Sequence, residues 1–219
     1  MKKVASVLAI VTILAAAAIA NDIRSINTVG YHTHTVSPGG LILVTPTVDN
    51  LNGNTLDDLI GEQLPNGTDI FVWNGTTWDP SENKLIGGWV PNLTASRGQG
   101  MFIRLEGSEP GDAEFSFTGE VPEYRNGGGT TDVDVAGIDA LGYPYPVAID
   151  FTSTAVAQAA ATGDDAFFWN GGGYDSAEKK LIGGWDANPN LAIGEAFFLQ
   201  AEGGPINTEE VQPYDLSSP

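Results

Sequence analysis

An internal repeat is the feature that most constrains this fold. The stretch WNGTTWDPSENKLIGGW at 73–89 returns as WNGGGYDSAEKKLIGGW at 169–185, with eleven of seventeen positions identical. The match continues without a gap over 69–105 and 165–201, at a constant offset of 96 residues. The sequence therefore predicts two copies of one structural unit. We place the first copy at 21–125, a Gly-rich linker at 126–131 and the second copy at 132–219.

Outside this block the copies align less closely. Residues 25–44 fit 132–151 loosely at an offset of 107, and after Leu105 the offset falls from 96 to 90. The second copy then lacks most of the segment GDAEFSF, so we expect its sheet to be one strand short. An open sheet edge accepts a strand from another chain, which favours assembly by strand donation. The alternative is a shorter loop with the edge covered internally. The expected donor segment contains Asn21, Asp22, Ile23, Ile26 and Val29.

An Asn-Gly dipeptide follows the first tryptophan of the repeated block in both copies. Asn-Gly is the preferred dipeptide of two-residue hairpin turns, because both central residues need positive φ. Such a turn places Phe71 opposite Trp78 in the first copy and Phe167 opposite Tyr174 in the second. We therefore expect an aromatic cross-strand pair in each hairpin.

Most of the remaining chain has the pattern of short strands. The segments 40–48, 100–105, 113–121 and 145–152 are β-branched or aromatic runs between turn signals. Only 54–64 is typical of a helix, with Thr55 as its N-cap, and the alanine-rich 153–161 is its expected counterpart. The predicted fold is all-β, with two tandem antiparallel β-sandwich or barrel-like domains and one short helix per repeat.

The order VGY, short helix, VWNG, GGW, GQGMFI and FTGEV in the first copy resembles an uncharacterised repeat domain. That domain is common in exported proteins of environmental Gram-negative bacteria. The resemblance covers most of 26–122 and, more loosely, 132–213. It implies a secreted or surface-attached β-domain, and it brings no catalytic residues to carry over.

The first twenty residues are typical of an export signal that is cleaved. Lys2 and Lys3 precede an uncharged apolar run, which ends in the small-x-small sequence Ala18-Ile19-Ala20. The alternative is a retained membrane anchor or a pilin-like helix. The cleaved chain would be secreted or held at the cell surface, with no membrane segment left.

Cleavage would leave a strongly acidic chain. All 28 acidic residues remain, and the nine basic residues fall to seven without Lys2 and Lys3, so the formal charge is 7 − 28 = −21. This charge excludes nucleic acid as a partner and disfavours an anionic membrane surface. There is no cysteine, so the fold depends on core burial rather than on disulfides.

Metal ligands are the first kind of candidate site. His32 and His34 point to the same side of an extended strand, and imidazole pairs suit zinc or copper. Asp49, Asp57 and Asp58 belong to a cluster of oxygen ligands that suit calcium, which could bridge acidic subunits. Surface histidines and solvated turns are the alternatives. No other cofactor is expected.

Aromatic side chains form the second kind of candidate site. Trp78, Trp89, Trp185 and Tyr174 lie in the repeated block, and flat aromatic rings often bind sugars. Alternating aromatics in strands are also typical of a core. The sequence contains no recognisable catalytic motif. We therefore expect a non-catalytic structural protein that self-associates, and as the alternative a module that binds glycans or surfaces.

Overall fold

The computed structural model describes residues 28–50, 52–123 and 129–214. Strands make up 46% of the described residues and helices 7%, which confirms the predicted mostly-β class. The expected export signal and four of the expected donor residues, Asn21, Asp22, Ile23 and Ile26, lie outside the described residues. None of the helices within the described ranges is long and apolar enough to cross a membrane.

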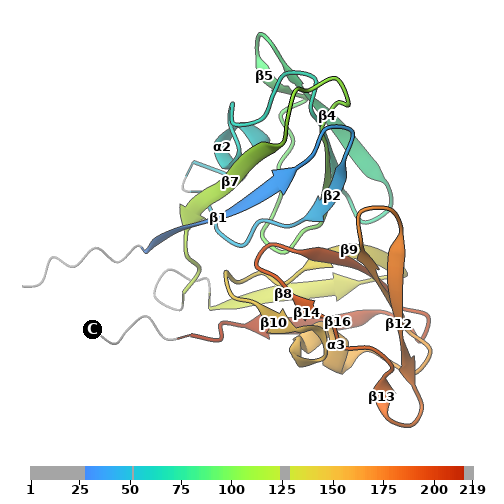
Figure 1. Ribbon diagram of the computed structural model, residues 1–219. Coiled ribbons are helices and arrows are strands. Elements are labelled where there is room, and N and C mark those ends of the chain that lie inside the picture. The colour runs from blue at the N-terminus through green and yellow to red at the C-terminus, as the bar shows by residue number, and fades with distance from the viewer. Residues whose placement is uncertain (1–27, 51, 124–128, 215–219) are drawn as a thin grey trace, which may run out of the picture.

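The described part of the first half contains seven strands and one short helix (Figure 1). In chain order these are β1 (Val29–Val36), β2 (Leu41–Val44), α2 (Leu56–Leu59), β3 (Asp69–Trp73), β4 (Trp78–Lys84), β5 (Gly88–Val90), β6 (Met101–Arg104) and β7 (Ala113–Glu120).

The second half repeats these elements and adds a small strand pair. It contains β8 (Thr130–Val135), β9 (Ile138–Gly142), β10 (Ile149–Asp150), the 3-10 helix η2 (Phe151–Ser153), α3 (Ala155–Ala159), β11 (Asp165–Trp169), β12 (Tyr174–Lys180), β13 (Gly184–Trp185), β14 (Asn190–Leu191), β15 (Ala196–Gln200) and β16 (Ile206–Val211).

The two halves share one topology, as the repeat predicts. A five-stranded antiparallel sheet has the order β2-β6-β3-β4-β5 in the first half and β9-β15-β11-β12-β13 in the second. A separate two-stranded sheet pairs β1 with β7 and β8 with β16. The counterpart of β1 is therefore β8, which begins at Thr130 inside the predicted linker. The upstream alignment at an offset of 107 was wrong, because it matched 25–44 to residues that begin inside β8 and extend past β9.

The expectation that the second sheet lacks a strand was also wrong. β16 pairs with β8 over its whole length, from Ile206 opposite Val135 to Val211 opposite Thr130. It is shorter than β7, but it occupies the same place. Part of the missing sequence falls in the preceding loop, because residues 105–112 connect β6 to β7 whereas 201–205 connect β15 to β16. The position that β7 holds next to β1 in the first half is therefore filled by β16 next to β8 in the second half.

The turns of the repeated hairpins also differ from the two-residue prediction. Trp73 lies opposite Trp78, so four residues form the loop. The Asn74 Oδ1 atom accepts hydrogen bonds from the backbone N–H groups of Thr76 (3.1 Å) and Thr77 (2.9 Å). An Asn side chain that binds the backbone in this way replaces the tight turn. The second copy does the same, which places Tyr174 opposite Trp169 rather than Phe167.

Both helices begin where the sequence indicates. The Thr55 hydroxyl accepts a hydrogen bond from the Asp58 N–H at 3.3 Å, and Thr154 caps α3 in the same way. Leu56 and Leu59 turn from α2 into the core of the first half. Because a single helical turn is only marginally stable alone, this burial holds α2 in place.

The strands β6 and β15 inside the five-stranded sheets are buried on both faces. In β6, Met101 and Ile103 face the core of the first half, whereas Phe102 faces the second half. In β15, Phe197 and Phe198 divide in the same way. This double burial explains the continuous apolar runs MFI and AFFL, which do not alternate with polar residues.

The halves meet in a symmetric aromatic junction. Its main members are equivalent residues from the two copies: Phe71 and Phe167, Trp73 and Trp169, Phe102 and Phe198, and Trp78 with Tyr174. Isolated backbone bridges link Val44 to Glu195 and Leu141 to Gln99. The second bridge is the first with the halves exchanged, so the halves are related by an approximate twofold axis.

Candidate functional site

Two hairpin tips carry the most exposed large apolar side chains among the described residues. Leu85 and Ile86, between β4 and β5, are 82% and 89% exposed. Leu181 and Ile182, between β12 and β13, are 83% and 89% exposed. We call these pairs the first tip and the second tip. Large side chains exposed to this degree in both copies contribute nothing to the core and favour contact with another surface.

The glycines of KLIGGW shape each tip. Lys84 lies opposite Gly88 in the strand pair, and Gly87 and Gly88 have φ of 105° and 65°. Only glycine adopts such angles readily, so the chain reverses direction there and leaves the preceding Leu-Ile pair in solvent. In the second copy, Gly183 and Gly184 have φ of 96° and 79°. The two tips are therefore locally alike.

The base of each tip is anchored by the tryptophan that follows it. Trp89 is 1% exposed and its Nε1 donates a hydrogen bond to the Gly61 carbonyl oxygen at 3.0 Å. Trp185 is half-buried, packs on Phe151 and donates from Nε1 to the Ala157 carbonyl oxygen at 2.9 Å. Both tryptophans are among the expected ligand-binding residues. Trp89 anchors the first tip to the segment that follows α2, and Trp185 anchors the second tip to α3.

The tips lie at opposite ends of the molecule. In Figure 1, β5 marks the end of the first half and β13 marks the far end of the second half. Lysines border both apolar pairs: Lys84 forms an ion pair with Glu82, and Lys180 forms ion pairs with Glu178 and Asp186. Each end therefore presents a small apolar tip above a base of paired charges.

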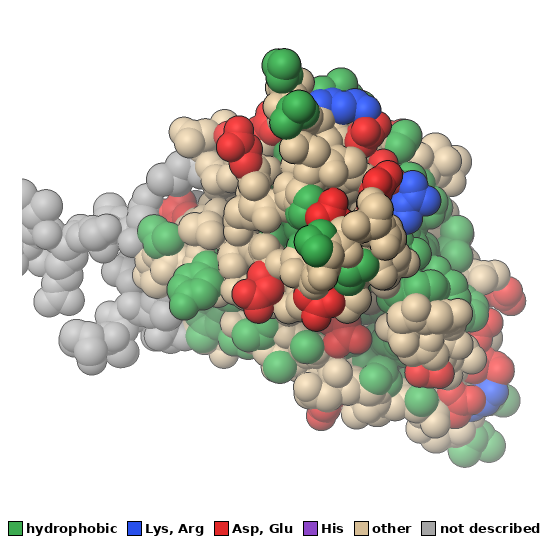
Figure 2. Space-filling view, turned by 45° about the horizontal axis from the view of Figure 1, so that its top comes forward, with side chains coloured by type: hydrophobic (Ala, Val, Ile, Leu, Met, Phe, Trp, Pro, Cys, Tyr) green, Lys and Arg blue, Asp and Glu red, His purple; other side chains and the backbone are tan. Residues whose placement is uncertain are grey.

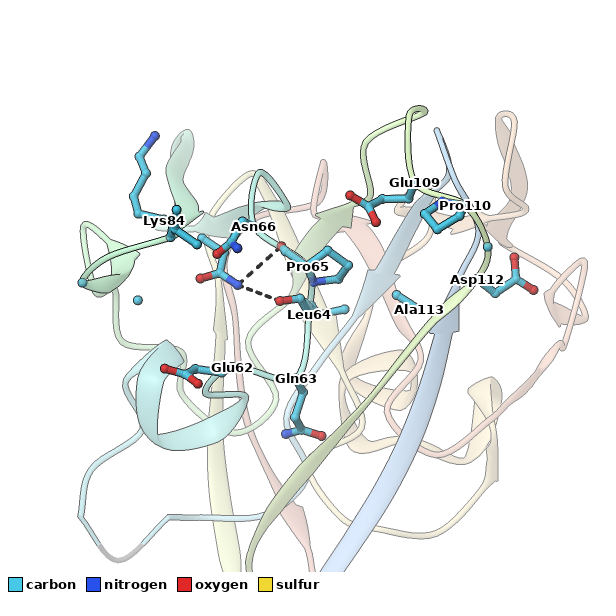
Figure 3. A pocket seen from close by; sticks show the side chains of 15 residues that line it. Glu62, Gln63, Leu64, Pro65, Asn66, Lys84, Glu109, Pro110, Asp112 and Ala113 are labelled. Carbon is cyan, nitrogen blue, oxygen red and sulfur yellow. Dashed lines mark hydrogen bonds between the residues drawn. The ribbon is translucent and has the colours of Figure 1, made fainter.

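A cavity of about 790 Å³ lies beside the first tip (Figure 3). Its walls come from the first tip itself, from the segment after α2 and from the loop between β6 and β7. Asn83 fixes the floor, because its Nδ2 donates to the Leu64 carbonyl oxygen at 2.7 Å. Cavities that hold small ligands have volumes of about 300–1000 Å³, so this one is large enough to receive a side chain or two.

Two longer connections create this cavity in the first half. The segment between α2 and β3 comprises 60–68, whereas its counterpart between α3 and β11 comprises only 160–164. The loop 105–112 is likewise longer than its counterpart 201–205. The walls that enclose the cavity are thus shortened in the second half, and the two ends of the molecule differ in shape.

The other two expected ligand-binding aromatics belong to the junction. Trp78 packs edge-on against Phe198 with ring centroids 5.8 Å apart, and Tyr174 packs against Phe198 at 5.7 Å. Burial raises the pKa of the Tyr174 hydroxyl. Both rings hold the halves together, although Tyr174 still exposes about half of its surface.

A smaller cleft of about 320 Å³ opens between the halves at one side of the junction. Its lining includes Trp73, Asn74, Arg97 and Asp139. The Arg97 Nη2 donates to the Thr131 hydroxyl at 2.9 Å. Burial raises the pKa of the Asp139 carboxyl, and the Ala140 N–H and the Trp73 indole oppose that rise. A cleft with aromatic, amide and charged groups could bind a polar molecule.

His32 and His34 lie side by side at the junction, on β1. Their ring centroids are 5.0 Å apart, and neither Nε2 atom has a hydrogen-bond partner. A Cβ at Gly194 would lie 2.5 Å and 2.6 Å from these atoms, so both face the second half. The His32 Nδ1 lies 3.0 Å from the Thr47 hydroxyl. Burial lowers the pKa of each ring to about 4.

The histidine pair gains no third metal ligand from the expected carboxylates. Within 28–50, 52–123 and 129–214, no three His, Cys, Asp or Glu residues are placed to hold a metal ion. Asp49 pairs with Arg97 at 3.5 Å, Asp57 accepts from the Trp89 N–H at 3.1 Å, and Asp58 accepts from the Thr55 hydroxyl at 2.6 Å. These carboxylates stabilise α2 and the loops next to it.

The surface between these features is acidic. Figure 2 shows Asp and Glu side chains scattered over the visible face, with few Lys and Arg side chains among them. The expected donor residue Val29 is 69% exposed at the start of β1. Sequence reasoning missed the tips as a site, because a Leu-Ile pair inside a hairpin block is typical of a core. The signal that could have found them is the Gly-Gly that follows the pair in both copies.

Comparison of the chain with protein-family models, with curated proteins and with solved structures found no match.

Proposed function

We propose that this chain is an exported, non-catalytic structural protein whose copies associate through their ends into an extracellular assembly. The observation that carries the proposal is the pair of exposed Leu-Ile tips at opposite ends of the molecule. A molecule with one adhesive group at each end can join two neighbours, which is the minimum requirement for a filament or a layer.

Burial of the exposed Leu and Ile side chains between two molecules contributes favourable free energy. Full burial of one Leu or Ile side chain contributes about 1.5–3 kcal/mol, so two side chains at one contact supply about 3–6 kcal/mol before the cost of association. The internal duplication and the export signal expected at 1–20 support a repetitive product outside the cell. The formal charge of −21 opposes close packing, so assembly should require salt or calcium to screen it.

The route of assembly differs from the strand donation expected from the sequence. That route depended on an open position in repeat 2, and β16 occupies it. The tips offer a route that leaves every described sheet intact. Val29 and Tyr31 on β1 are also exposed, so substitutions at these residues test strand donation separately from association through the tips.

The test is electron microscopy and sedimentation of the full chain after export from a Gram-negative host, with and without salt and calcium. The wild type should form ordered oligomers or filaments. Replacing all four tip residues, Leu85, Ile86, Leu181 and Ile182, by Ser should abolish them. Replacing Val29 and Tyr31, which are 69% and 74% exposed, by Ser should leave them intact. A wild type that stays monomeric under every condition would refute the proposal.

A second candidate function is binding of a glycan or another polar molecule in the cleft between the halves. The combination of Trp73, Asn74 and Asp139 around about 320 Å³ favours it. The test is binding of the wild type to a glycan array, compared with Asp134→Ala, at a residue that also lines the cleft, and with Glu209→Ala, at a residue that does not. Binding lost only in Asp134→Ala supports this candidate, and binding unchanged in both variants rejects it.

A further inference from the structure

We propose that His32 and His34 bind one monovalent copper ion between their Nε2 atoms, at the junction of the two halves. Both residues lie on β1, two positions apart, so their side chains project from the same face of the strand. Their Nε2 atoms are buried, and neither has a hydrogen-bond partner. The site goes beyond the proposed assembly function, because it is complete within one copy of the chain.

The place for the ion lies beside Gly194. A Cβ built on this glycine would be 2.5 Å from the His32 Nε2 and 2.6 Å from the His34 Nε2. The two nitrogen atoms are therefore at most 5.1 Å apart, which is the sum of those distances. Metal–imidazole bonds are about 2.0–2.1 Å long, so shifts of about 0.5 Å bring both nitrogens into bonding distance of an ion near that point. Glycine leaves the place free because it has no side chain.

The surroundings of His32 favour a free lone pair on its Nε2 atom. The His32 Nδ1 lies 3.0 Å from the Thr47 hydroxyl oxygen, which can accept a hydrogen bond from it. A hydrogen on Nε2 would have no acceptor. We therefore assign the hydrogen to Nδ1, which leaves Nε2 with the lone pair that a metal ion binds. In metal sites a second polar group commonly orients the ligand ring in this way.

The second half shows that this fold does not need imidazoles at these positions. Counted from the first residue of each strand, Val133 and Val135 on β8 correspond to His32 and His34 on β1. Valines fill such positions without a polar atom that lacks a partner. Two buried imidazole nitrogens without hydrogen bonds destabilise the fold by comparison. A bound ion would supply the missing partner for both nitrogens at once.

The small set of ligands selects a soft monovalent ion. Zinc takes four ligands in structural and catalytic sites, and calcium takes six to eight oxygen atoms. Within the described ranges, no third His, Cys, Asp or Glu residue joins the pair. Imidazole suits copper, and the closed-shell Cu(I) ion is stable with two nitrogen ligands. Its single charge also costs less free energy to bury than the double charge of zinc.

Aromatic rings enclose the pair, and a cleft leads to it. The centroid of the Phe117 ring lies 5.2 Å from that of His32 and 5.8 Å from that of His34. The Phe115 ring stacks on His34 at 5.5 Å. Aromatic rings shield the place from water, and their faces attract cations. A cleft of about 370 Å³, lined by His34 and Glu195 among others, gives an ion a path from solvent.

The test is competition for Cu(I) between the full exported chain and the indicator bicinchoninate, without oxygen and with excess ascorbate. His32 and His34 are the only histidines and the chain has no cysteine, so few other soft ligands compete. The wild type should remove one Cu(I) per chain from the indicator. The double variant His32→Val, His34→Val, which copies the second half, should bind at least about a hundredfold more weakly.

Two further variants separate the site from its surroundings. Gly194→Ala keeps both imidazoles but places a Cβ where the ion would lie, so it should weaken binding at least about tenfold. The matched control is Thr33→Ala, between the two histidines, because the Thr33 hydroxyl bonds instead to the Ser116 hydroxyl at 2.7 Å. This control should bind like the wild type. Circular dichroism verifies that each variant folds, and the double variant decides alone if Gly194→Ala does not.

X-ray absorption at the copper edge identifies the ligands of the bound ion. Two nitrogen neighbours and no sulfur neighbour are expected. A wild type that takes no Cu(I) from the indicator would overturn the proposal, as would equal binding by the double variant. A sulfur neighbour would place the ion on a methionine, and displacement by equimolar zinc would contradict the two-ligand site. None of these outcomes depends on whether copies of the chain assemble.

Discussion

The histidine pair at the junction makes a quantitative prediction about acid stability. His32 and His34 have a pKa of about 4 in the folded chain, against 6.5 when free in solution. Well above pH 6.5 both rings are neutral in the folded and the unfolded state. As the pH falls from 6.5 to 4, the unfolded state binds protons that the folded state does not. The free energy of unfolding therefore falls through this window.

The magnitude follows from the size of the shift. A difference of about 2.5 units at about 1.4 kcal/mol per unit gives about 3 kcal/mol for each ring at pH 4, and about 2 kcal/mol for each at pH 5. The effect has a structural cause, because both Nε2 atoms are buried against the backbone at Gly194 without an acceptor. A proton on either Nε2 atom there has no acceptor to replace water.

The second half supplies the matched variant. Val29 is the first residue of β1 and lies opposite the last residue of β7, and Thr130 is likewise the first residue of β8 and lies opposite the last residue of β16. Counting from these two residues, His32 corresponds to Val133 and His34 to Val135. The double variant His32→Val, His34→Val copies that arrangement. We expect the wild type to lose about 4 kcal/mol more than the variant between pH 7 and pH 5.

Urea unfolding followed by tryptophan fluorescence measures this difference, provided that the slope with urea stays the same in both proteins. The many carboxylates titrate alike in the two chains, so the difference isolates the rings. Parallel curves of free energy against pH for wild type and variant would refute the assignment of buried neutral histidines.

Two further substitutions test the packing that holds the tips and the halves. Trp89→Ala should lower the free energy of unfolding by about 3–5 kcal/mol in urea, because it empties a buried site beside α2, and a loss below 1 kcal/mol would contradict the anchoring role. Gly142→Val should cost about 1–3 kcal/mol, because its Cβ would lie 2.1 Å from the Thr45 side chain across the junction. Gly172→Val, which meets no neighbour, is its control, and equal loss in both would contradict the close approach of the halves.

The repeated block made the central sheets predictable. Because 69–105 and 165–201 match without a gap, the strands β3, β4 and β6 had to recur as β11, β12 and β15. Thr55 before an apolar face likewise predicted the start of α2, because a threonine N-cap acts within one turn. Local signals of this kind suffice when the partner lies close in the chain.

Pairings between distant segments were harder to predict. β16 has the sequence INTEEV, in which Glu210 is buried, so its pattern does not indicate a strand equivalent to AEFSFTGE. The hairpin loops were missed because an Asn side chain can replace a tight turn. The tips were missed because composition alone does not show whether a Leu-Ile pair points into the protein or into solvent.

The aromatic junction has one consequence for how the copies can differ. In an assembly of two separate identical chains, every substitution alters the shared surface twice, at positions related by symmetry. Covalent fusion removes that coupling, so one copy can carry imidazoles where the other keeps valines, and one end can acquire a hollow that the other lacks. Tethering thereby turns a symmetric pair into a particle with a direction.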